Sequence, residues 1–538
     1  MSVTEEILST IGDFGFFQKM LLFGFSFQFF LFSTLFSHLV FFQSDPDRHC
    51  NTDWILAADS NLTADEQLDL TLPREENGTF SQCRMFVPVD WNISVIRQHR
   101  LNETTGCLNG WVYYNTQYKA TIVTDFDFVC DMSLMPGFVQ TVFMAGSAVG
   151  AFIFGPLAQS YGRRRSTQLP AVLMLIFVLV MALSPNYSTY LVAEFMLGIS
   201  FAGLRMNSVL LATEWIGGRR SLATCICQLS SSVGQIAVVV LIYFVRDWRV
   251  VQYILTGMQA VVFVYIWWIP ESARWLLEKG RFEEANEIIR RVAKVNKRSV
   301  PEDLLLLVSE RKKVHNGGIK MIFTSKILMK YLLIVSFVSF SLNLSIFSIN
   351  LNVGKFGVSI FLVHSLFGIF DIPAHCLCLW FLERGGRKTS QALTALAGGI
   401  LCMSTVVFPQ DNAAVITAIV TMGRFFLSWG ISVNMVYAQE LFPTSVRQAA
   451  FGLVNTFLRL AGPLSALLNM LSIFHQFIPI VVFSSLLIVS GALVILLPET
   501  RDKDLPDSED FLENNRSDAT KQSGRVFNTA ENNGIEAT

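Results

Sequence analysis

The stretch at residues 445–470, SVRQAAFGLVNTFLRLAGPLSALLNM, has the apolar composition of a membrane-crossing helix, yet it holds an arginine at its centre. A set of small and polar residues recurs at steps of three and four, which places them on one helix face: Gly452, Asn455, Arg459, Gly462, Ala466 and Asn469. A guanidinium at the bilayer centre costs roughly 2.5 to 3.5 kcal/mol on insertion scales, so it cannot face lipid. The stretch therefore predicts a helix inside a membrane bundle, with Arg459 turned toward the interior.

Two interpretations of Arg459 follow from this position. In the first, the arginine is aimed at a substrate pathway and supplies the counter-charge for a ligand. In the second, it is a structural residue that pairs with another group inside the bundle.

The composition of the whole chain agrees with a membrane protein. Of 538 residues, 52% are hydrophobic and only 15% are charged, and 46 are phenylalanine, which is too apolar for a soluble domain. The net charge of −1 gives no indication of nucleic-acid binding. The sequence contains neither a phosphate-binding loop nor a cysteine and histidine spacing typical of a metal site. We therefore expect no enzyme, no cofactor and no metal, and a lipid bilayer as surroundings.

The segment at 43–135 differs from its neighbours. Residues 43–131 contain 14 acidic and 6 basic side chains. They also hold four cysteines (Cys50, Cys83, Cys107 and Cys130) and four glycosylation sequons (Asn61, Asn77, Asn92 and Asn102). This combination predicts a glycosylated extracellular loop with two disulfides, because such bonds persist in an oxidising compartment. Four cysteines allow three pairings, and all three stay open.

Hydropathy divides the rest of the chain into an all-α protein with twelve transmembrane helices. Residues 1–42 contain the first span at their C-terminal end, residues 136–269 contain five more, and residues 331–497 contain six. Between them, residues 270–330 carry 14 basic and 8 acidic side chains, so the positive-inside rule makes this loop cytoplasmic. The polar tail at 498–538 is expected to be disordered and cytoplasmic as well. An even number of spans then places both termini inside the cell.

The two halves repeat one another. Arg163 and Arg387 are 224 residues apart, Glu214 and Glu440 are 226 apart, and Pro270 and Pro498 are 228 apart, each within similar local sequence. Nearly equal offsets indicate a duplication of six helices. Parallel six-helix repeats are the architecture of major facilitator transporters, whose substrate site lies at mid-membrane between the halves.

The motifs of the chain resemble those of solute carrier family 22, the organic ion transporters of the major facilitator superfamily. The resemblance covers nearly the whole chain and rests on GPLAQSYGRRR, LATEW, DWR, PESARW, YAQELFPTSVRQ and LLPET, together with the loop of four cysteines. Within the family, the chain is most similar to the branch that holds a urate and nicotinate exchanger and a riboflavin transporter.

The resemblance assigns roles to particular residues. Arg459 stands where organic anion members carry arginine and organic cation members carry aspartate. His375 stands where anion members often have a lysine or an arginine; alternatively, it is a packing residue bonded to Asp371 one turn away. Further substrate-binding candidates are Phe347, Asn455, Tyr437, Gln235, Arg205 and His38. The gating candidates are Arg163, Arg164, Glu214, Arg220, Glu383, Arg387, Glu440 and Arg447.

Taken together, these features favour a secondary-active or facilitative transporter that exchanges small organic anions by alternating access, with an exchanged counter-anion as its second ligand. We expect it in the plasma membrane, with an internal membrane as the alternative. Two alternatives stay open. In the first, the cargo is riboflavin or another vitamin or zwitterion. In the second, the chain is a non-transporting receptor or scaffold, because the family's charge pair in the first cytoplasmic turn is replaced by Gln159 and Ser160. Sequence gives no oligomeric state.

Overall fold

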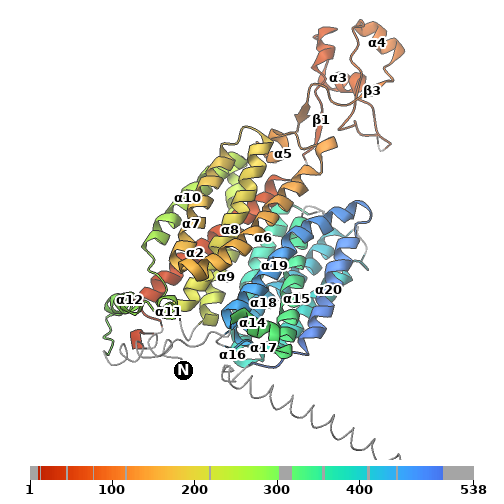
Figure 1. Ribbon diagram of the computed structural model, residues 1–538. Helices are drawn as coiled ribbons and strands as arrows, with labels where there is room; N and C mark the ends of the chain where they lie inside the picture. Colours follow the sequence, from red (N-terminus) through yellow and green to blue (C-terminus); the bar gives the residue numbers. More distant parts are fainter. Residues whose placement is uncertain are drawn as a thin grey trace, which may run out of the picture.

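The computed structural model describes residues 10–500, apart from residues 13, 44–45, 77, 115–117, 217–219, 302–317, 354–357, 409–411 and 444–445. It is a long bundle of helices with a small separate domain at one end (Figure 1). We call this small domain, formed by residues 46–132, the loop domain. The predicted tail lies outside the described residues from position 501 onward.

Six long helices form the first half of the bundle: α2 (Phe16–Phe42), α6 (Met135–Tyr161), α7 (Arg163–Ala182), α8 (Tyr187–Trp215), α9 (Arg220–Val245) and α10 (Trp248–Trp268). Local sequence sets two of their starts. The Asn186 side chain accepts a hydrogen bond from the Thr189 amide at 2.9 Å, and Asp247 accepts one from the Arg249 amide at 2.9 Å. Both caps satisfy N–H groups that have no partner inside the first helical turn.

The second half is built from α15 (Lys326–Leu351), α16 (Ile360–Arg384), α17 (Arg387–Ser404), α18 (Ala413–Glu440), α19 (Arg447–Met470) and α20 (Ile478–Val494), with the short 3₁₀ turn η4 (Leu471–Ile473) before α20. Among the described residues, ten helices are long and apolar enough to cross a membrane, and α17 and α20 are not among these ten. Helix α17 begins with Arg387 and Lys388, and α20 has only 17 residues. For these two helices the predicted spans stay a prediction.

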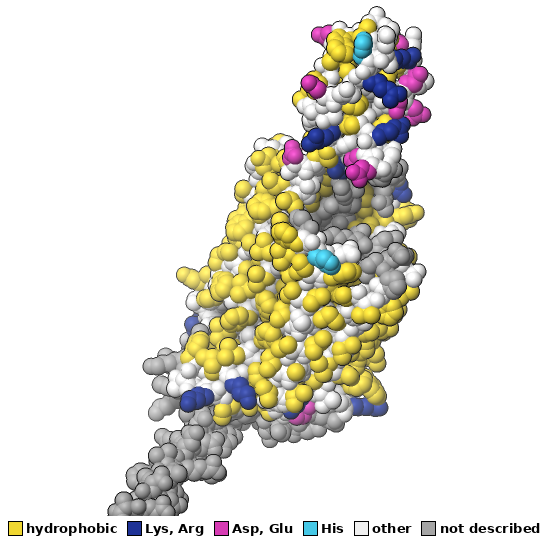
Figure 2. Space-filling model, turned by 90° about the vertical axis from the view of Figure 1, so that its right-hand side faces the viewer, with side chains coloured by type: hydrophobic (Ala, Val, Ile, Leu, Met, Phe, Trp, Pro, Cys, Tyr) yellow, Lys and Arg dark blue, Asp and Glu magenta, His cyan; other side chains and the backbone are white. Residues whose placement is uncertain are grey.

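The surface of the bundle is apolar, as expected for a multi-pass membrane protein. In Figure 2, hydrophobic side chains cover the sides of the bundle, while charged side chains gather on the loop domain and at the opposite end. Large side chains such as Phe23, Phe244 and Trp268 are 76%, 77% and 84% exposed. An apolar surface of this extent is suited to lipid rather than to water.

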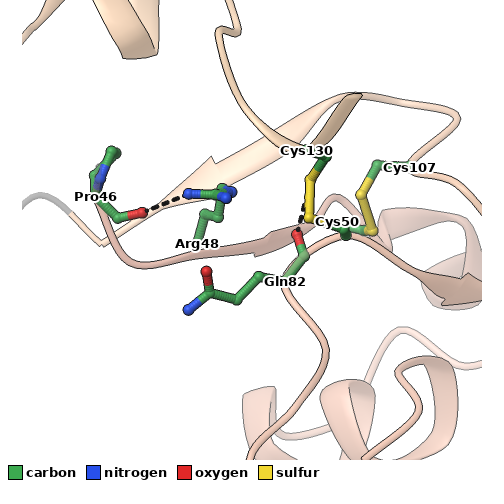
Figure 3. The surroundings of a disulfide bond; sticks show 7 residues. Pro46, Arg48, Cys50, Gln82, Cys107 and Cys130 are labelled. Atoms are coloured by element: carbon green, nitrogen blue, oxygen red, sulfur yellow. Dashed lines mark hydrogen bonds between the residues drawn. A yellow bond between two sulfur atoms is a disulfide. The ribbon is translucent and has the colours of Figure 1, made fainter. Parts of the chain in front are cut away.

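The loop domain is held together by two disulfides, Cys50–Cys107 and Cys83–Cys130, with Cα separations of 5.0 and 5.6 Å (Figure 3). The structure thus selects one of the three pairings that the sequence left open. Two small antiparallel sheets pair β1 (Arg48–Cys50) with β4 (Trp111–Tyr113) and β2 (Met85–Phe86) with β3 (Thr104–Thr105). The remaining elements are η1 (Asp53–Ala57), α3 (Ala64–Thr71), α4 (Ile93–His99), α5 (Ile122–Asp125) and η2 (Cys130–Met132).

The base of the loop domain is bound to the turn between α9 and α10. The Lys119 amide donates to the Arg246 carbonyl at 2.8 Å. The Asp125 carboxylate accepts from the Trp248 ring N–H at 3.0 Å and from Arg249 Nε at 3.1 Å. These contacts attach the domain to the first half of the bundle.

Short helices cover the end of the bundle that lies away from the loop domain: α11 (Ala273–Glu278), α12 (Phe282–Val295) and α14 (Gly318–Thr324). Asn296, directly after α12, forms hydrogen bonds with the first residues of α2. Its side-chain oxygen accepts from the Phe17 amide at 2.8 Å, and its Nδ2 donates to Gln18 Oε1 at 2.9 Å. The predicted cytoplasmic loop is therefore tied to the first membrane helix.

The most extensive contacts between the two halves are made by two helix pairs, α6 with α19 and α9 with α16. Glycines permit close approach at both. A Cβ atom built on Gly462 of α19 would lie 2.7 Å from Met144 Sδ of α6, and one on Gly368 of α16 would lie 2.7 Å from Ile236 of α9. The space enclosed between these pairs holds the candidate site.

Candidate functional site

Two adjoining cavities lie between the halves. The larger, of about 160 Å³, is lined by residues from α2, α6, α8, α9, α15, α16, α18 and α19. The smaller, of about 50 Å³, lies on the side away from the loop domain and is lined by α2, α8, α9, α18 and α19. Four residues line both cavities: Arg205, Gln228, Met435 and Arg459. Both arginines were substrate-binding candidates.

Arg459 and Arg205 face the cavities from opposite halves, on α19 and α8. Both side chains are half-buried, and within the described part of the chain neither forms an ion pair or a hydrogen bond. The Arg205 guanidinium lies over the Phe29 ring, 5.7 Å from its centroid, and the two arginine charges repel each other. The arrangement leaves positive charge available to a ligand.

The acidic side chains of the described spans do not neutralise this charge. Glu214 is held by Arg163, Asp371 by Arg424 and Glu440 by Arg387. Glu194 precedes Arg205 by eleven residues on α8, which is about 16 Å along a helix. Its side chain is fully buried, and neither carboxylate oxygen has a hydrogen-bond partner. We have no physical account of Glu194.

Sequence reasoning missed Arg424 on α18, which is the centre of a buried polar network. Its Nη2 atom lies 3.1 Å from Asp371 Oδ2 on α16 and 3.2 Å from Gln235 Oε1 on α9, and Nη1 donates to Asn350 on α15. Its guanidinium also stacks over Phe367 at 4.6 Å. The signal was present, because a lone aspartate and a lone arginine in separate membrane spans are expected to pair.

His375 lies beside this network rather than bonded to Asp371. Its Nδ1 atom is 2.8 Å from the Ser432 hydroxyl on α18, while Asp371 accepts from Ser428 at 2.6 Å. The packing alternative therefore named the wrong partner. His375 does line the larger cavity, although only 6% of it is exposed.

The other substrate-binding candidates divide into two groups. Gln235 and Phe347 line the larger cavity, and Asn455 lines the smaller. Tyr437 lies away from both, because its hydroxyl donates to the Pro498 carbonyl at 2.6 Å. We therefore remove Tyr437 from the site. The side chain of His38 lies outside the described residues.

At the loop-domain end, aromatic rings from both halves close the space between them. Phe36 of α2 packs on Phe347 of α15 with centroids 5.5 Å apart, and Phe41 packs on Phe361 of α16 at 5.2 Å. Tyr118, at the base of the loop domain, lies 5.9 Å from Phe361. These ring contacts join the two halves on the loop-domain side of the larger cavity, while the smaller cavity lies toward the other end.

Several gating candidates form a network that we call the first latch. The guanidinium of Arg163 contacts Glu214 at 3.0 Å and donates to the Ala158 carbonyl at 2.7 Å. The backbone amides of Arg163 and Arg164 both donate to Glu271, at 2.8 and 3.1 Å. The Arg163 and Glu214 side chains are 1% and 3% exposed, so this ion pair is shielded from water.

The second half repeats the arrangement, and we call this copy the second latch. Arg387 contacts Glu440 at 3.0 Å, donates to the Leu382 carbonyl at 2.8 Å, and its amide donates to Glu499 at 2.7 Å. The duplication read from the sequence thus extends to single hydrogen bonds. The second ion pair is more open, with side chains 17% and 24% exposed.

The remaining gating candidates are only partly described. Arg447 Nε donates to the Phe442 carbonyl at 3.2 Å. The side chains of Arg220 and Glu383 lie outside the described residues.

Comparisons with known proteins agree with this architecture. Residues 119–466 match the model of the Major Facilitator Superfamily. Human solute carrier family 22 member 13 is 36% identical over 516 residues, covering 95% of this chain and 94% of that protein. Solute carrier family 22 member 6-A of Xenopus laevis is 31% identical (87% and 86% covered), and organic anion transporter 3 of Oryctolagus cuniculus is 29% identical (95% and 93% covered).

Solved structures of the same fold include the proton:xylose symporter XylE. Its complex with 6-bromo-6-deoxy-D-glucose has a TM-score of 0.59 at 16% identity, covering 92% of this chain and 98% of that one. Its inward open form from E. coli has a TM-score of 0.57 at 17% identity, with 92% and 99% covered. At these identities the likeness establishes the fold alone.

Proposed function

Because this chain belongs to solute carrier family 22 of the Major Facilitator Superfamily, and is therefore a membrane transporter and not an enzyme, we propose that it exchanges small organic anions by alternating access. Its ligands are then one organic anion and an exchanged counter-anion, and its surroundings are the lipid bilayer of the plasma membrane.

The observation that carries the proposal is the charge of the cavities. Three arginines line them (Arg205, Arg424 and Arg459), against a single aspartate, Asp371, which Arg424 already holds. Arg459 has no partner among the described residues, so it can hold an anionic group that enters between the halves. A charge-assisted bond between a guanidinium and a carboxylate is stronger than a hydrogen bond between neutral groups.

The proposed topology places the loop domain outside the cell and both termini inside. Its disulfides fit an oxidising compartment, and the basic stretch at 270–330 fits the cytoplasmic side. Among the sequons, Asn61, Asn92 and Asn102 have exposed side chains, and Asn77 lies outside the described residues. In this topology the aromatic contacts at the loop-domain end support an inward-facing state, with the latches on the cytoplasmic side.

Substitution of Arg459 tests the proposal. Its removal should weaken anion handling by about 1.5 to 3 kcal/mol, or roughly 10- to 150-fold, because a hydrogen bond to a charged group is lost. Arg459→Lys keeps the charge without the planar fork and should retain part of the activity toward carboxylates, whereas Arg459→Asp should repel them. The measurement is uptake of nicotinate, urate and riboflavin by each variant.

Uptake must be divided by surface expression, so that misfolding is not mistaken for lost binding. Counter-anion-stimulated flux in proteoliposomes would exclude a receptor or scaffold without transport. If Arg459→Asp reaches the membrane and carries anions at the wild-type rate, Arg459 is structural and the proposal loses its support. Preferred uptake of riboflavin would instead favour the vitamin alternative.

A further inference from the structure

Helix α12 ends in a turn that is usually built on glycine, but this chain has a lysine there. The Arg298 amide donates to the Ala293 carbonyl at 2.9 Å, and the Lys297 amide donates to the Lys294 carbonyl at 3.1 Å. This pair of bonds is a Schellman motif, in which the residue at the position of Lys297 has a left-handed backbone. The φ angle of Lys297 is 56°. Since a side chain disfavours this conformation, a lysine in place of glycine indicates a use for its charge.

The turn is fixed against the start of α2, beside which α12 lies (Figure 1). Asn296 accepts a hydrogen bond from the Phe17 amide at 2.8 Å and donates one to the Ile11 carbonyl at 3.2 Å. Gly15 permits this approach, because a Cβ atom there would overlap with the Asn296 side chain. The side chains of Lys297 and Arg298, the next two residues, are exposed. They therefore lie close to the first turn of α2.

Neighbouring side chains show where this turn lies relative to the membrane. The Tyr265 hydroxyl of α10 donates to the carbonyls of Met20 and Leu21, at 3.2 and 3.3 Å, so the end of α10 lies beside the start of α2. Trp268, the last residue of α10, is 84% exposed, and Phe16, the first residue of α2, is 66% exposed. Exposed tryptophan is typical of the boundary between lipid chains and headgroups. The turn after α12 is therefore at the level of the headgroups.

The surface at this level is positively charged. Residues 288–301 contain no acidic side chain and five basic ones: Arg290, Arg291, Lys294, Lys297 and Arg298. Lys19 adds an exposed positive charge in the first turn of α2. None of the described carboxylates pairs with Lys19, Lys297 or Arg298. These three side chains are therefore free to bind an anionic group.

We propose that Lys19, Lys297 and Arg298 bind the headgroup of an anionic phospholipid in the cytoplasmic leaflet. Its acyl chains lie against the exposed apolar residues at the start of α2 and the end of α10. Basic side chains close to a membrane surface attract anionic lipids, each by about fivefold in binding. An acidic protein segment would match the charge but would not need the adjoining apolar surface. The combination of both features selects a lipid.

Binding of two lipids that differ only in headgroup tests the proposal. The full chain is purified in detergent, and native mass spectrometry counts bound phosphatidylserine and phosphatidylcholine with the same acyl chains. We expect wild type to retain phosphatidylserine preferentially. Arg298→Gln should weaken its binding about fivefold, and Arg298→Gln combined with Lys297→Gly roughly 25-fold, because each change removes one charge.

Lys297→Gly separates lost charge from lost structure. Glycine suits the left-handed position, so this variant should unfold at the wild-type temperature or above it while it loses affinity for phosphatidylserine. Arg84→Gln is the control, because it removes one exposed positive charge from the loop domain at the other end of the molecule and should keep the wild-type preference.

Two soluble competitors distinguish the lipid from other anions. Glycerophosphoserine, the headgroup without acyl chains, and polyglutamate should not displace phosphatidylserine at equal concentration. Displacement by the first would assign the surface to a soluble phosphate compound, and displacement by the second would assign it to an acidic protein; either result overturns the proposal. So would a wild type without preference between the lipids, or a double variant that keeps the preference. None of these measurements depends on transport, so their failure leaves the proposed function intact.

Discussion

Arg424 of α18 and Asp371 of α16 form an ion pair at 3.1 Å inside the bundle, where their side chains are 6% and 7% exposed. Each charge is compensated by the other. Removing one partner of such a pair leaves an uncompensated buried charge and typically costs about 3 to 5 kcal/mol. We expect Asp371→Asn and Arg424→Gln each to lower thermal stability strongly in detergent. The double variant Asp371→Leu with Arg424→Leu should recover part of the loss, since it buries no charge.

The Arg291 and Glu287 pair on α12 is the matched control, because its side chains are 68% and 71% exposed. Glu287→Gln should change stability by less than about 1 kcal/mol, as for other solvated pairs. Equal losses from the exposed and the buried pair would show that the Arg424 network does not support the fold.

Single residues were predictable where an isolated charge stood out in an apolar stretch. Arg459 was recognised in this way, although Arg424, which has the same signal, was missed; Arg205 was a candidate through the family resemblance, and all three line the larger cavity. Tyr437 was misplaced because an aromatic side chain in a helix has no distinctive signal, and its partner Pro498 is 61 residues away. The bond between His375 and Ser432 was missed for the same reason, since it joins two helices.

At the scale of helices, α6 and α8 pack with almost no side chain between their backbones. A Cβ atom on Gly198 of α8 would lie 2.2 Å from the Phe143 carbonyl oxygen of α6. Since backbone cannot move aside easily, Gly198→Ala should separate the helices and cost about 1 to 3 kcal/mol, the usual range for overpacking. The loss should appear as a lower unfolding temperature of the purified protein.

Gly257 of α10 supplies the comparison, because a Cβ atom there meets nothing within 4 Å. Gly257→Ala should leave stability unchanged or raise it slightly, as alanine suits a helix interior better than glycine. A similar loss in both variants would mean that backbone contact between α6 and α8 is not the cause.

Most elements of the bundle could be predicted because hydropathy and caps are local properties. A helix of the structure lies at each predicted span, and Asn186 and Asp247 mark two starts in the sequence itself. The strands of the loop domain could not be predicted, since they are two or three residues long and pair over distances such as Arg48 with Tyr113. The choice of disulfide pairing is a tertiary property as well.

Across the whole molecule, the two latches make the same contacts with unequal shielding. Arg163 and Glu214 are 1% and 3% exposed, whereas Arg387 and Glu440 are 17% and 24% exposed. Arg163→Ala should therefore cost more stability than Arg387→Ala, because water can solvate the glutamate left behind in the second latch but not in the first. Unfolding temperatures of the two variants, measured side by side, give the comparison.

High salt gives an independent check on the same difference, since ions screen the more exposed pair more effectively. In wild type, the effects of salt on the two latches cannot be measured separately. The Arg163→Ala variant retains only the second latch, so added salt should lower its unfolding temperature more than that of Arg387→Ala. Equal costs and equal salt responses would indicate that burial does not distinguish the two halves.

The loop domain also has a consequence in time. All four disulfide cysteines have been synthesised once the ribosome has added Cys130, and 408 residues of the chain follow it. At about 5 to 20 residues per second, the ribosome needs roughly 20 to 80 s to add the remainder. With the proposed topology, oxidation and glycan attachment can therefore precede synthesis of the second half. The domain that can be completed before the second half exists is thus one that contributes no residue to the cavities.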